Sequence, residues 1–378
     1  MDFQRLKEEL IEYSEQIGIQ KIGFTTADTF ETLKERLAVQ QALSYQSGFE
    51  KGSIEERTTP RLLMPKAQSI ISIALAYPSR MKETPRGTKG DRRGIFARVS
   101  WGKDYHVVLR EKLNLLGEFL QNKLSDVQYK VMVDTGELSD RAVAERAGVG
   151  FVGKNCSLIT EEYGSYVYLG ELITNIPFAP DEPIEEGCGD CTICIDACPT
   201  GALVQGGQLN AQKCIAYQTL TKQFLPDEFR DKIGNRLYGC DTCQQVCPKN
   251  KGIDFHVHPE FEPDPELVKP RLVPLLTISN REYKEKFGDM SSSWRGKKPI
   301  QRNAIIALAH YKEKASVDLL ATLMKEDPRP VIRGTAAWAI GKINRDDAET
   351  LIEEAMTTEK DEEVIHEMKK GLQLLSKG

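Results

Sequence analysis

Two short stretches decide how this chain is built: residues 188–199 read CGDCTICIDACP, and residues 240–248 read CDTCQQVCP. Eight of the nine cysteines fall between residues 188 and 247, and only Cys156 lies outside that range. The N-terminal MDFQRLKEEL is a charged helix pattern and not a signal peptide, so a disulfide framework is not expected. The cysteines are therefore expected to bind metal.

The spacing of these cysteines favours iron–sulfur clusters. The first stretch has the C-x2-C-x2-C-x3-C-P run of bacterial ferredoxins, and the second repeats it without the first cysteine. Three closely spaced thiolates reach one cluster and the fourth is carried to the other. We expect 4Fe–4S ligands in two sets: Cys188, Cys191, Cys194 and Cys247 for the first cluster, and Cys198, Cys214, Cys240 and Cys243 for the second. Two zinc sites are the alternative, because CxxC pairs also bind zinc. We expect Cys156 to be a small buried residue.

Composition limits the remaining possibilities. The chain has 378 residues, of which 40% are hydrophobic and 28% charged, as in soluble proteins of two or three domains. No apolar run approaches the roughly 20 residues that span a bilayer, so we expect a cytoplasmic protein without membrane contact. The net charge of −5 means that any nucleic-acid binding must depend on local basic patches.

Strands and helices alternate along the first half of the chain. This order predicts an α/β domain over residues 1–180, followed by a ferredoxin-like two-cluster domain over 181–253. Five prolines between residues 254 and 274 indicate a linker, which we extend over 254–290. The expected helices cover residues 2–17, 105–123 and 139–147, and the expected strands cover 19–25, 69–77, 129–134 and 166–174.

The C-terminal region, residues 291–378, contains a repeat. The segment that begins at Ile300 aligns with segments that begin at Val331 and Val364. Paired helices at this period are typical of HEAT-like repeats, and an ordinary helical bundle is the alternative. The overall fold class is therefore α+β multidomain.

Two regions are strongly basic. Residues 291–345 hold 11 Lys and Arg against 4 Asp and Glu, and residues 80–110 hold 9 against 3. The second region also carries Phe96, Trp101 and Tyr105. Basic segments with interleaved aromatic residues raise a nucleic-acid hypothesis, although charged helix faces are usually only solvated.

A glycine loop and an aspartate complete the candidate sites. Gly148, Gly150 and Gly153 match G-x-G-x-x-G, but they follow a predicted helix and not a strand, which argues against nucleotide binding. We expect this loop to pass close to a large ligand. Asp134 ends an apolar strand, where it is either a proton donor or a helix-capping residue.

The stretch from Val133 to Asn155, VDTGELSDRAVAERAGVGFVGKN, resembles the signature of the epoxyqueuosine reductase family. The cysteine runs and the C-terminal repeats follow in the same order, so the resemblance covers the whole chain. It implies an oxidoreductase of tRNA processing that reduces the epoxide of epoxyqueuosine at the wobble position of tRNA to queuosine, the last step of queuosine biosynthesis. The family is related to reductive dehalogenases.

The resemblance also implies cofactors, residues and partners. A cobalamin, its cobalt reduced through two 4Fe–4S clusters, would act with Asp134 as the proton donor. The residues implied to contact the cobalamin are Arg57, Ala97, Asp134, Leu158, Ala216 and Asp241. The partners would be the anticodon loop of tRNA and an external electron donor, and we expect a monomer. Candidate phosphate contacts are Lys297, Lys298, Arg302, Arg333 and Lys342.

Two other functions remain open at this point: a corrinoid reductase of a small molecule and a non-enzymatic electron carrier. The Asp-x-His-x-x-Gly motif that supplies a lower cobalt ligand in some cobalamin enzymes is absent. Asp254-Phe-His256-Val-His-Pro259 approaches it, but has Pro in place of Gly.

Overall fold

The computed structural model describes residues 2–376, which form two compact units. Each unit is assembled from three separate segments of the chain. The first unit comprises Met1–Arg80, Lys103–Cys214 and Asp241–Glu262, and the second comprises Met81–Gly102, Ile215–Cys240 and Pro263–Gly378.

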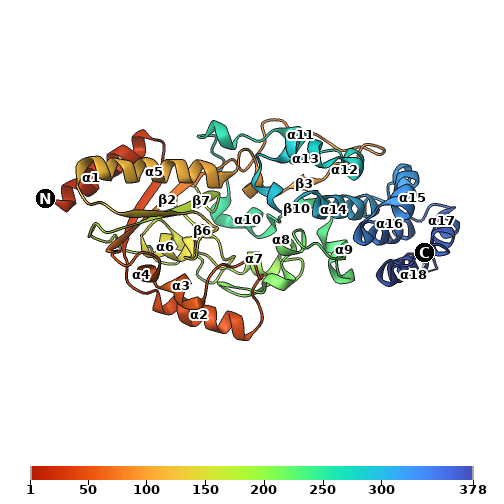
Figure 1. The fold of residues 1–378 in the computed structure, drawn as a ribbon, viewed down its shortest axis with the longest axis horizontal. Helices are drawn as coiled ribbons and strands as arrows, with labels where there is room; N and C mark the ends of the chain where they lie inside the picture. Colours follow the sequence, from red (N-terminus) through yellow and green to blue (C-terminus); the bar gives the residue numbers. More distant parts are fainter. Residues whose placement is uncertain (1, 377–378) are drawn as a thin grey trace. The chain divides into compact units, whose positions relative to one another are not determined.

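A four-stranded sheet forms the centre of the first unit (Figure 1). Its strand order is β1-β2-β7-β4, and every neighbouring pair is antiparallel. The strands are β1 (Lys21–Thr26), β2 (Ser69–Ala76), β4 (Tyr129–Met132) and β7 (Val167–Thr174). The predicted mixture of strands and helices is confirmed. Because the strands are antiparallel, however, the end of β4 does not lie beside the carboxyl end of β7.

Helices cover both faces of this sheet, because its strands are apolar on both sides. The helices α1 (Phe3–Gln16) and α5 (Tyr105–Lys123) pack on one face, where Leu10 and Leu113 join Ile71 and Ile73 of β2 in one core cluster. The helix α6 (Asp140–Arg146) covers the other face. In Figure 1, α1 and α5 lie above the sheet and α6 lies below it.

The outer parts of the first unit are short elements. The helices α2 (Glu31–Ala42), α3 (Ile54–Thr58) and α4 (Pro60–Leu63) lie between β1 and β2 in the sequence. Two hairpins follow β4. They are formed by β5 (Phe151–Val152) with β6 (Leu158–Ile159), and by β8 (Leu203–Gln205) with β9 (Gln208–Leu209). The two cysteine runs include the one-turn helices α7 (Ile193–Asp196) and α10 (Thr242–Gln245).

The second unit is mainly helical and has one large core cluster. Within the described residues, its only pair of parallel strands is formed by β3 (Ile95–Phe96) and β10 (Arg236–Tyr238). The short helices around it are α8 (Ile215–Gln218), α9 (Asp227–Ile233), α11 (Pro265–Val268), α12 (Leu272–Thr277) and α13 (Asn280–Phe287). The segment expected as a linker thus contains helices, and Leu272 and Phe287 are buried in the core.

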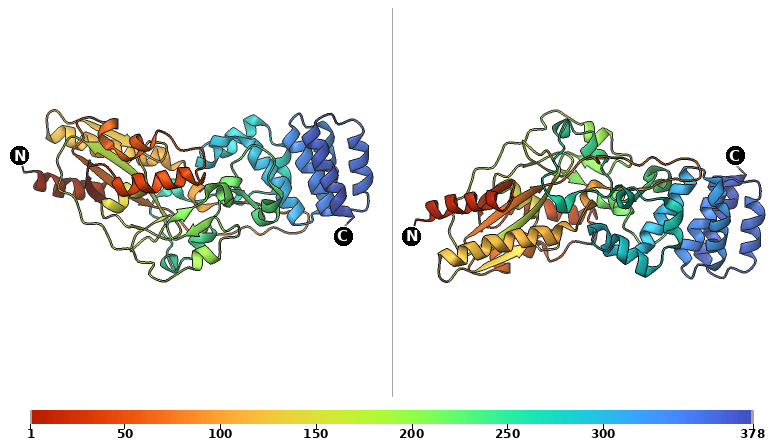
Figure 2. Two further views of the ribbon diagram at one scale, coloured as in Figure 1. Left: turned by 90° about the horizontal axis from the view of Figure 1, so that it is seen from below. Right: turned by 90° about the horizontal axis from the view of Figure 1, so that it is seen from above.

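Five helices end the chain, and three of them begin near the aligned repeat segments. They are α14 (Lys297–His310), α15 (Val317–Glu326), α16 (Pro330–Ile343), α17 (Ala348–Met356) and α18 (Glu362–Leu375). They lie side by side in both views of Figure 2. A Cβ atom at Gly341 would lie 2.1 Å from the carbonyl oxygen of Gly371, so only glycine permits α16 and α18 to pack this closely.

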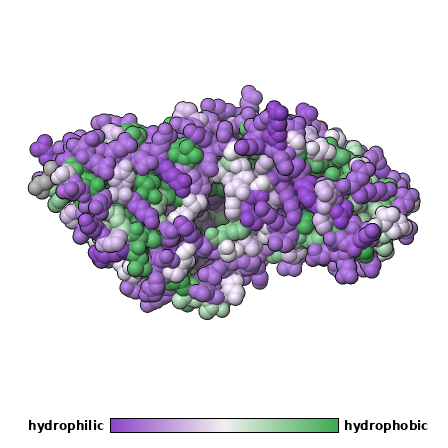
Figure 3. Space-filling view, viewed as in Figure 1, coloured by the Kyte–Doolittle hydropathy of each residue, from purple (hydrophilic) through white to green (hydrophobic). Residues whose placement is uncertain are grey.

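Hydrophilic residues predominate on the face in view in Figure 3. Between residues 2 and 376, no helix is both long enough and apolar enough to span a membrane.

Candidate active site and cysteine sites

Asp134 lies two residues after the end of β4, in a loop that turns sharply. Its backbone has φ of 49°, in the left-handed region that non-glycine residues rarely adopt, and its side chain is 61% exposed. One carboxylate oxygen, Oδ2, lies 3.3 Å from Nε2 of His106. The hydrogen bond with His106 lowers the pKa of Asp134 below its ordinary value. The carboxyl group is therefore both accessible and paired with an imidazole ring.

His106 stands in the first turn of α5 between two aspartates. Asp104 caps this helix by accepting from the backbone N–H of His106 at 3.0 Å, and it also lies 2.6 Å from His106 Nδ1. Partial burial alone would lower the pKa of His106, but the hydrogen bonds to Asp104 and Asp134 outweigh it and raise the pKa to about 9. At neutral pH the row Asp104–His106–Asp134 therefore holds a proton on His106.

Two further carboxyl groups, those of Asp140 and Glu171, interact with Asp134. Asp140, the first residue of α6, accepts through Oδ2 from the backbone N–H of Asp134 at 2.8 Å. Burial raises the pKa of Asp140 to about 7, and the nearby charge of Asp134 adds to this effect. Glu171 of β7 is fully buried, and burial raises its pKa well above the ordinary value. Sequence analysis did not single out His106, Asp140 or Glu171.

Four cysteines surround one small cavity. Cys188, Cys191, Cys194 and Cys247 line it together with Lys154 and Pro248. These are the four residues expected to hold the first cluster, and four convergent thiols fit the ligand requirement of a 4Fe–4S cluster. The backbone N–H of Lys154 donates to Sγ of Cys188 at 3.4 Å, the kind of contact that tunes cluster potential.

The other cysteines differ in their surroundings. Cys198 and Cys243 pack against the same apolar cluster of the first unit, which contains Cys156 and Leu203. Cys214 follows the short 3-10 helix Ala211–Lys213, and Cys240 follows β10. Cys156 is 9% exposed, which confirms that it is a small buried residue.

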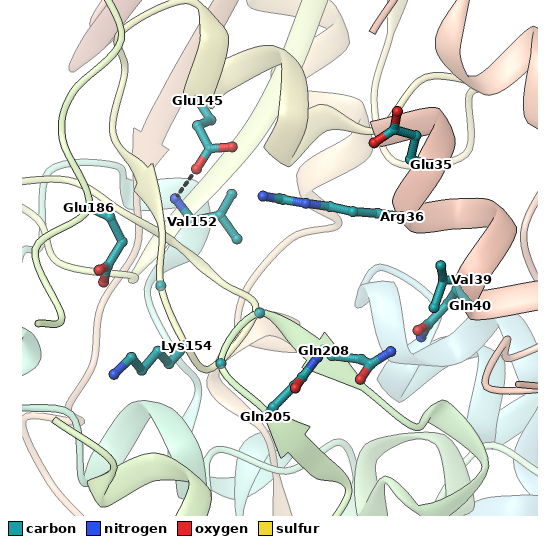
Figure 4. A pocket seen from close by; sticks show the side chains of 13 residues that line it. Glu35, Arg36, Val39, Gln40, Glu145, Val152, Lys154, Glu186, Gln205 and Gln208 are labelled. Atoms are coloured by element: carbon teal, nitrogen blue, oxygen red, sulfur yellow. Dashed lines mark hydrogen bonds between the residues drawn. The ribbon is translucent and has the colours of Figure 1, made fainter. Parts of the chain in front are cut away.

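A second cavity, of 590 Å³, is lined by residues of α2, β5 and the β8–β9 hairpin (Figure 4). Lys154 lines both this cavity and the four-cysteine cavity. Arg36 extends from α2 toward Val152, whose backbone N–H donates to Glu145 at 2.8 Å. The cavity thus provides polar space beside Cys188, whose backbone N–H donates to the cavity-lining Glu186 at 2.5 Å.

The glycine loop packs against the chain itself. A Cβ atom at Gly148 would lie 2.5 Å from the carbonyl oxygen of Glu182, and one at Gly150 would lie 2.4 Å from that of Ile159. At Gly153 the nearest atom, Cδ1 of Ile159, would be 2.5 Å away. Close internal packing therefore accounts for glycine at these three positions, and the expected approach of this loop to a large ligand stays a prediction.

Most of the expected phosphate contacts are already engaged. Arg302 is fully buried on α14 and donates to the carbonyl oxygens of Gln218, Thr221 and Gln223. Arg333 forms a two-bond ion pair with Glu359. The remaining lysines differ: Lys342 pairs with Asp231, Lys297 donates to the carbonyl oxygen of Ile278, and Lys298 is half-buried. The expectation for Arg302 is wrong because a fully buried guanidinium cannot reach a phosphate.

The residues expected to contact cobalamin lie in varied settings. Arg57 of α3 is half-buried, and burial lowers its pKa. Its side chain has no hydrogen bond or ion pair with any residue of the described range 2–376. Leu158 and Asp241 are buried in the first unit, whereas Ala97 is buried and Ala216 is half-buried in the second.

Family models match three parts of the chain. The model described as "Epoxyqueuosine reductase QueG, DUF1730" matches residues 57–135. A "4Fe-4S double cluster binding domain" matches residues 187–250, and "HEAT repeats" match residues 295–373. The 4Fe–4S double-cluster module and the HEAT repeats predicted from the sequence are therefore confirmed.

Curated relatives match over most or all of their length. The epoxyqueuosine reductase of Bacillus cereus is 67% identical over 376 residues, which cover 100% of this chain and 99% of the relative. The enzyme of Escherichia coli is 30% identical over 90% of both chains. A solved epoxyqueuosine reductase "with a tRNA-TYR epoxyqueuosine-modified tRNA stem loop" has a TM-score of 0.98 and 68% identity, over 99% of this chain and 100% of that chain.

A second solved structure bears on the loop after β4. The epoxyqueuosine reductase of Bacillus subtilis, described "with the Asp134 catalytic loop swung out of the active site", has a TM-score of 0.97 and 67% identity, over 99% of this chain and 100% of that chain. Sequence, domain content and fold thus agree along the whole length. The chain belongs to the epoxyqueuosine reductase family of oxidoreductases.

Proposed function

We propose that this chain reduces the epoxide of epoxyqueuosine in tRNA with Asp134 as the acid, a cobalamin as the reducing cofactor and two 4Fe–4S clusters as the electron relay. The observation that carries the proposal is the row Asp104–His106–Asp134, in which the Asp134 carboxyl group lies next to a protonated imidazole. The structure of the Bacillus subtilis relative is described with an "Asp134 catalytic loop", which supports this role.

The proton balance follows from the geometry of this row. Removal of an epoxide oxygen as water consumes two electrons and two protons. His106 passes its Nε2 proton across 3.3 Å to Asp134, which delivers it to the departing oxygen. Asp104 holds the ring through Nδ1 and stabilises its charged form. The second proton enters from water, because the Asp134 carboxyl is exposed.

Residues of the chain fit the cofactors. Bound cobalamin supplies a cobalt centre that stores two electrons and is a strong nucleophile toward carbon. Arg57, half-buried and without an ionic partner in the described chain, suits the phosphate that cobalamin carries. The other proposed contacts remain Ala97, Asp134, Leu158, Ala216 and Asp241. The clusters are assigned to Cys188, Cys191, Cys194 and Cys247, and to Cys198, Cys214, Cys240 and Cys243.

Electrons from an external donor are proposed to enter at the first cluster. The 590 Å³ cavity shares Lys154 with the cavity that its cysteines line. For tRNA, the proposed phosphate contacts move from Arg302 to side chains of the second unit that are not fully buried. Arg86 and Lys89 are exposed, and Lys298 is half-buried. The solved relative with a bound tRNA stem loop supports this partner.

An anaerobic turnover experiment tests the acid. The cluster-loaded enzyme with cobalamin is given epoxyqueuosine-containing tRNA, and queuosine is measured after single turnover. We expect Asp134→Asn to lower the rate by about 100-fold or more, the usual contribution of a general acid. The matched control is Asp126→Asn, an exposed aspartate that also has positive φ, 64°, but lies outside the site. A normal rate for Asp134→Asn would overturn the proposal.

A cofactor titration tests the remaining part. Cob(II)alamin is added anaerobically to cluster-loaded protein and followed by absorption and EPR before and after dithionite. We expect a bound cobalamin signal without nitrogen superhyperfine splitting, because the motif that supplies a lower histidine ligand is absent. Folded, cluster-loaded protein that bound no cobalamin would contradict the assignment of this cofactor.

A further inference from the structure

A carboxyl group lies in the middle of the sheet without a partner. Glu171 of β7 stands opposite Ser72 of β2 and Met132 of β4, on the face covered by α6. It is fully buried, and neither carboxylate oxygen has a hydrogen bond with any residue in the range 2–376. Its neighbours on the same face, Leu169 and Ile173, are apolar. A methionine or leucine would suit this position better if packing were its only role.

An unpartnered buried carboxyl is retained at a cost in stability, so it calls for an explanation. Burial favours its neutral form, and the charges of Asp140 and Asp134 strengthen this preference. Asp140 in turn interacts with Asp134 and Arg141. Asp140 is only half-buried, at the start of α6, so it is the carboxyl group of the two that solvent can help to ionise.

Asp140 is the member of the pair that contacts the active-site loop. Its Oδ2 accepts from the backbone N–H of Asp134 at 2.8 Å. That backbone has φ of 49°, a strained conformation for a residue with a side chain, and it persists only when neighbouring groups stabilise it. A charged acceptor binds an N–H more strongly than a neutral one. The ionised form of Asp140 is therefore the form that holds this conformation best.

We propose that Asp140 is a positioning residue: its carboxylate holds the Asp134 loop in its catalytic conformation through the 2.8 Å hydrogen bond to the Asp134 backbone. The inference rests on the proposed role of Asp134 and extends it. Asp140 does not touch the substrate, and its effect on the reaction is exerted through the Asp134 backbone. The strongest consequence is that loss of the Asp140 charge releases the loop without altering the acid itself.

Hydrogen–deuterium exchange on the loaded enzyme tests the contact directly. We expect Asp140→Ala to speed exchange of the Asp134 amide by about tenfold or more at constant pH, because the bond that protects it is gone. Glu171→Gln, which is permanently neutral, should leave that amide protected. Unchanged protection in Asp140→Ala would overturn the proposal, and this measurement does not depend on whether Asp134 is the acid.

The dependence of steady-state kcat on pH is the second measurement. Asp140→Asn should lower kcat by about tenfold with little change in KM, because a neutral amide oxygen holds the loop less well. Glu171→Gln should keep both kcat and the pH profile, because a neutral amide replaces a carboxyl group that is already neutral. Ser72→Ala, at the buried position opposite Glu171, is the control and should leave the profile unchanged.

Iron content and circular dichroism confirm that each variant is folded. If Asp140→Asn left kcat unchanged although the Asp134 amide exchanged faster, the contact would not position the acid and the proposal would fall. If Asp134→Asn proved fully active while Asp140→Ala still lost amide protection, the proposed acid would fail and the positioning contact would stand.

Discussion

The buried guanidinium of Arg302 provides the sharpest test of the repeat region. In Arg302→Met, the carbonyl oxygens of Gln218, Thr221 and Gln223 lose charged donors at 2.7, 2.8 and 2.7 Å. Each carbonyl oxygen left without a donor costs about 1–3 kcal/mol of unfolding free energy, and removal of the buried charge offsets part of this loss. We expect the second unit to lose about 3 kcal/mol of unfolding free energy.

The assay uses the tryptophans of the chain. All three, Trp101, Trp294 and Trp338, belong to the second unit, so their fluorescence in urea follows the unfolding of that unit. The matched control is Lys298→Met, which removes one positive charge from the same helix. It should change stability by less than about 0.5 kcal/mol.

Binding of tRNA should distinguish the two variants in the opposite way: Lys298→Met should affect it, and Arg302→Met should not. Lys298→Met should weaken binding and lower the slope of log K against log salt by about 1, as loss of one phosphate contact does. Arg302→Met, measured at a temperature where it is folded, should leave that slope unchanged. A stable Arg302→Met protein with a reduced slope would refute the reasoning.

Three further outcomes are expected. Because the folded-state pKa of His106 is raised to about 9, its contribution to stability is complete below about pH 6.5 and is lost as the pH rises through 9; His106→Gln should remove this part of the pH dependence of urea unfolding. Gly23→Ala should destabilise the first unit by about 2 kcal/mol or more in thermal unfolding, since its Cβ atom would lie 2.1 Å from the carbonyl oxygen of Ala147. Cys188→Ser should lower iron content by about half, whereas Cys156→Ser should leave it unchanged; equal iron in both variants would contradict the ligand assignment.

Local patterns predicted the regular elements well. The helix expected over residues 105–123 has those bounds, because leucines at helical spacing mark its buried face. The helix α2 was not predicted because none of its residues is buried, so its sequence carries no amphipathic pattern. Prolines between residues 254 and 274 indicated a linker, although Pro265 lies in the first turn of α11, where proline is favoured.

The candidate site was predictable only where its residues are close in sequence. The spacing of the two cysteine runs predicts seven of the eight proposed ligands, whereas Cys214 lies outside both runs. His106, 28 residues from Asp134, and Glu171, 37 residues away, come near it through the packing of α5 and the register of β4 with β7. Arg302 was misassigned because a count of charges along the chain contains no information on burial.

The division of each unit into three segments has a consequence for synthesis. A ribosome releases the chain from its N-terminus, so the first unit lacks its last segment until Glu262 has emerged. Meanwhile the segment Met81–Gly102 waits for partners that begin at Ile215, and Phe96 stays uncovered until β10 has emerged. Neither unit can be completed before the other has begun, so the repeats cannot be removed as a separate module without exposing apolar surface that promotes aggregation.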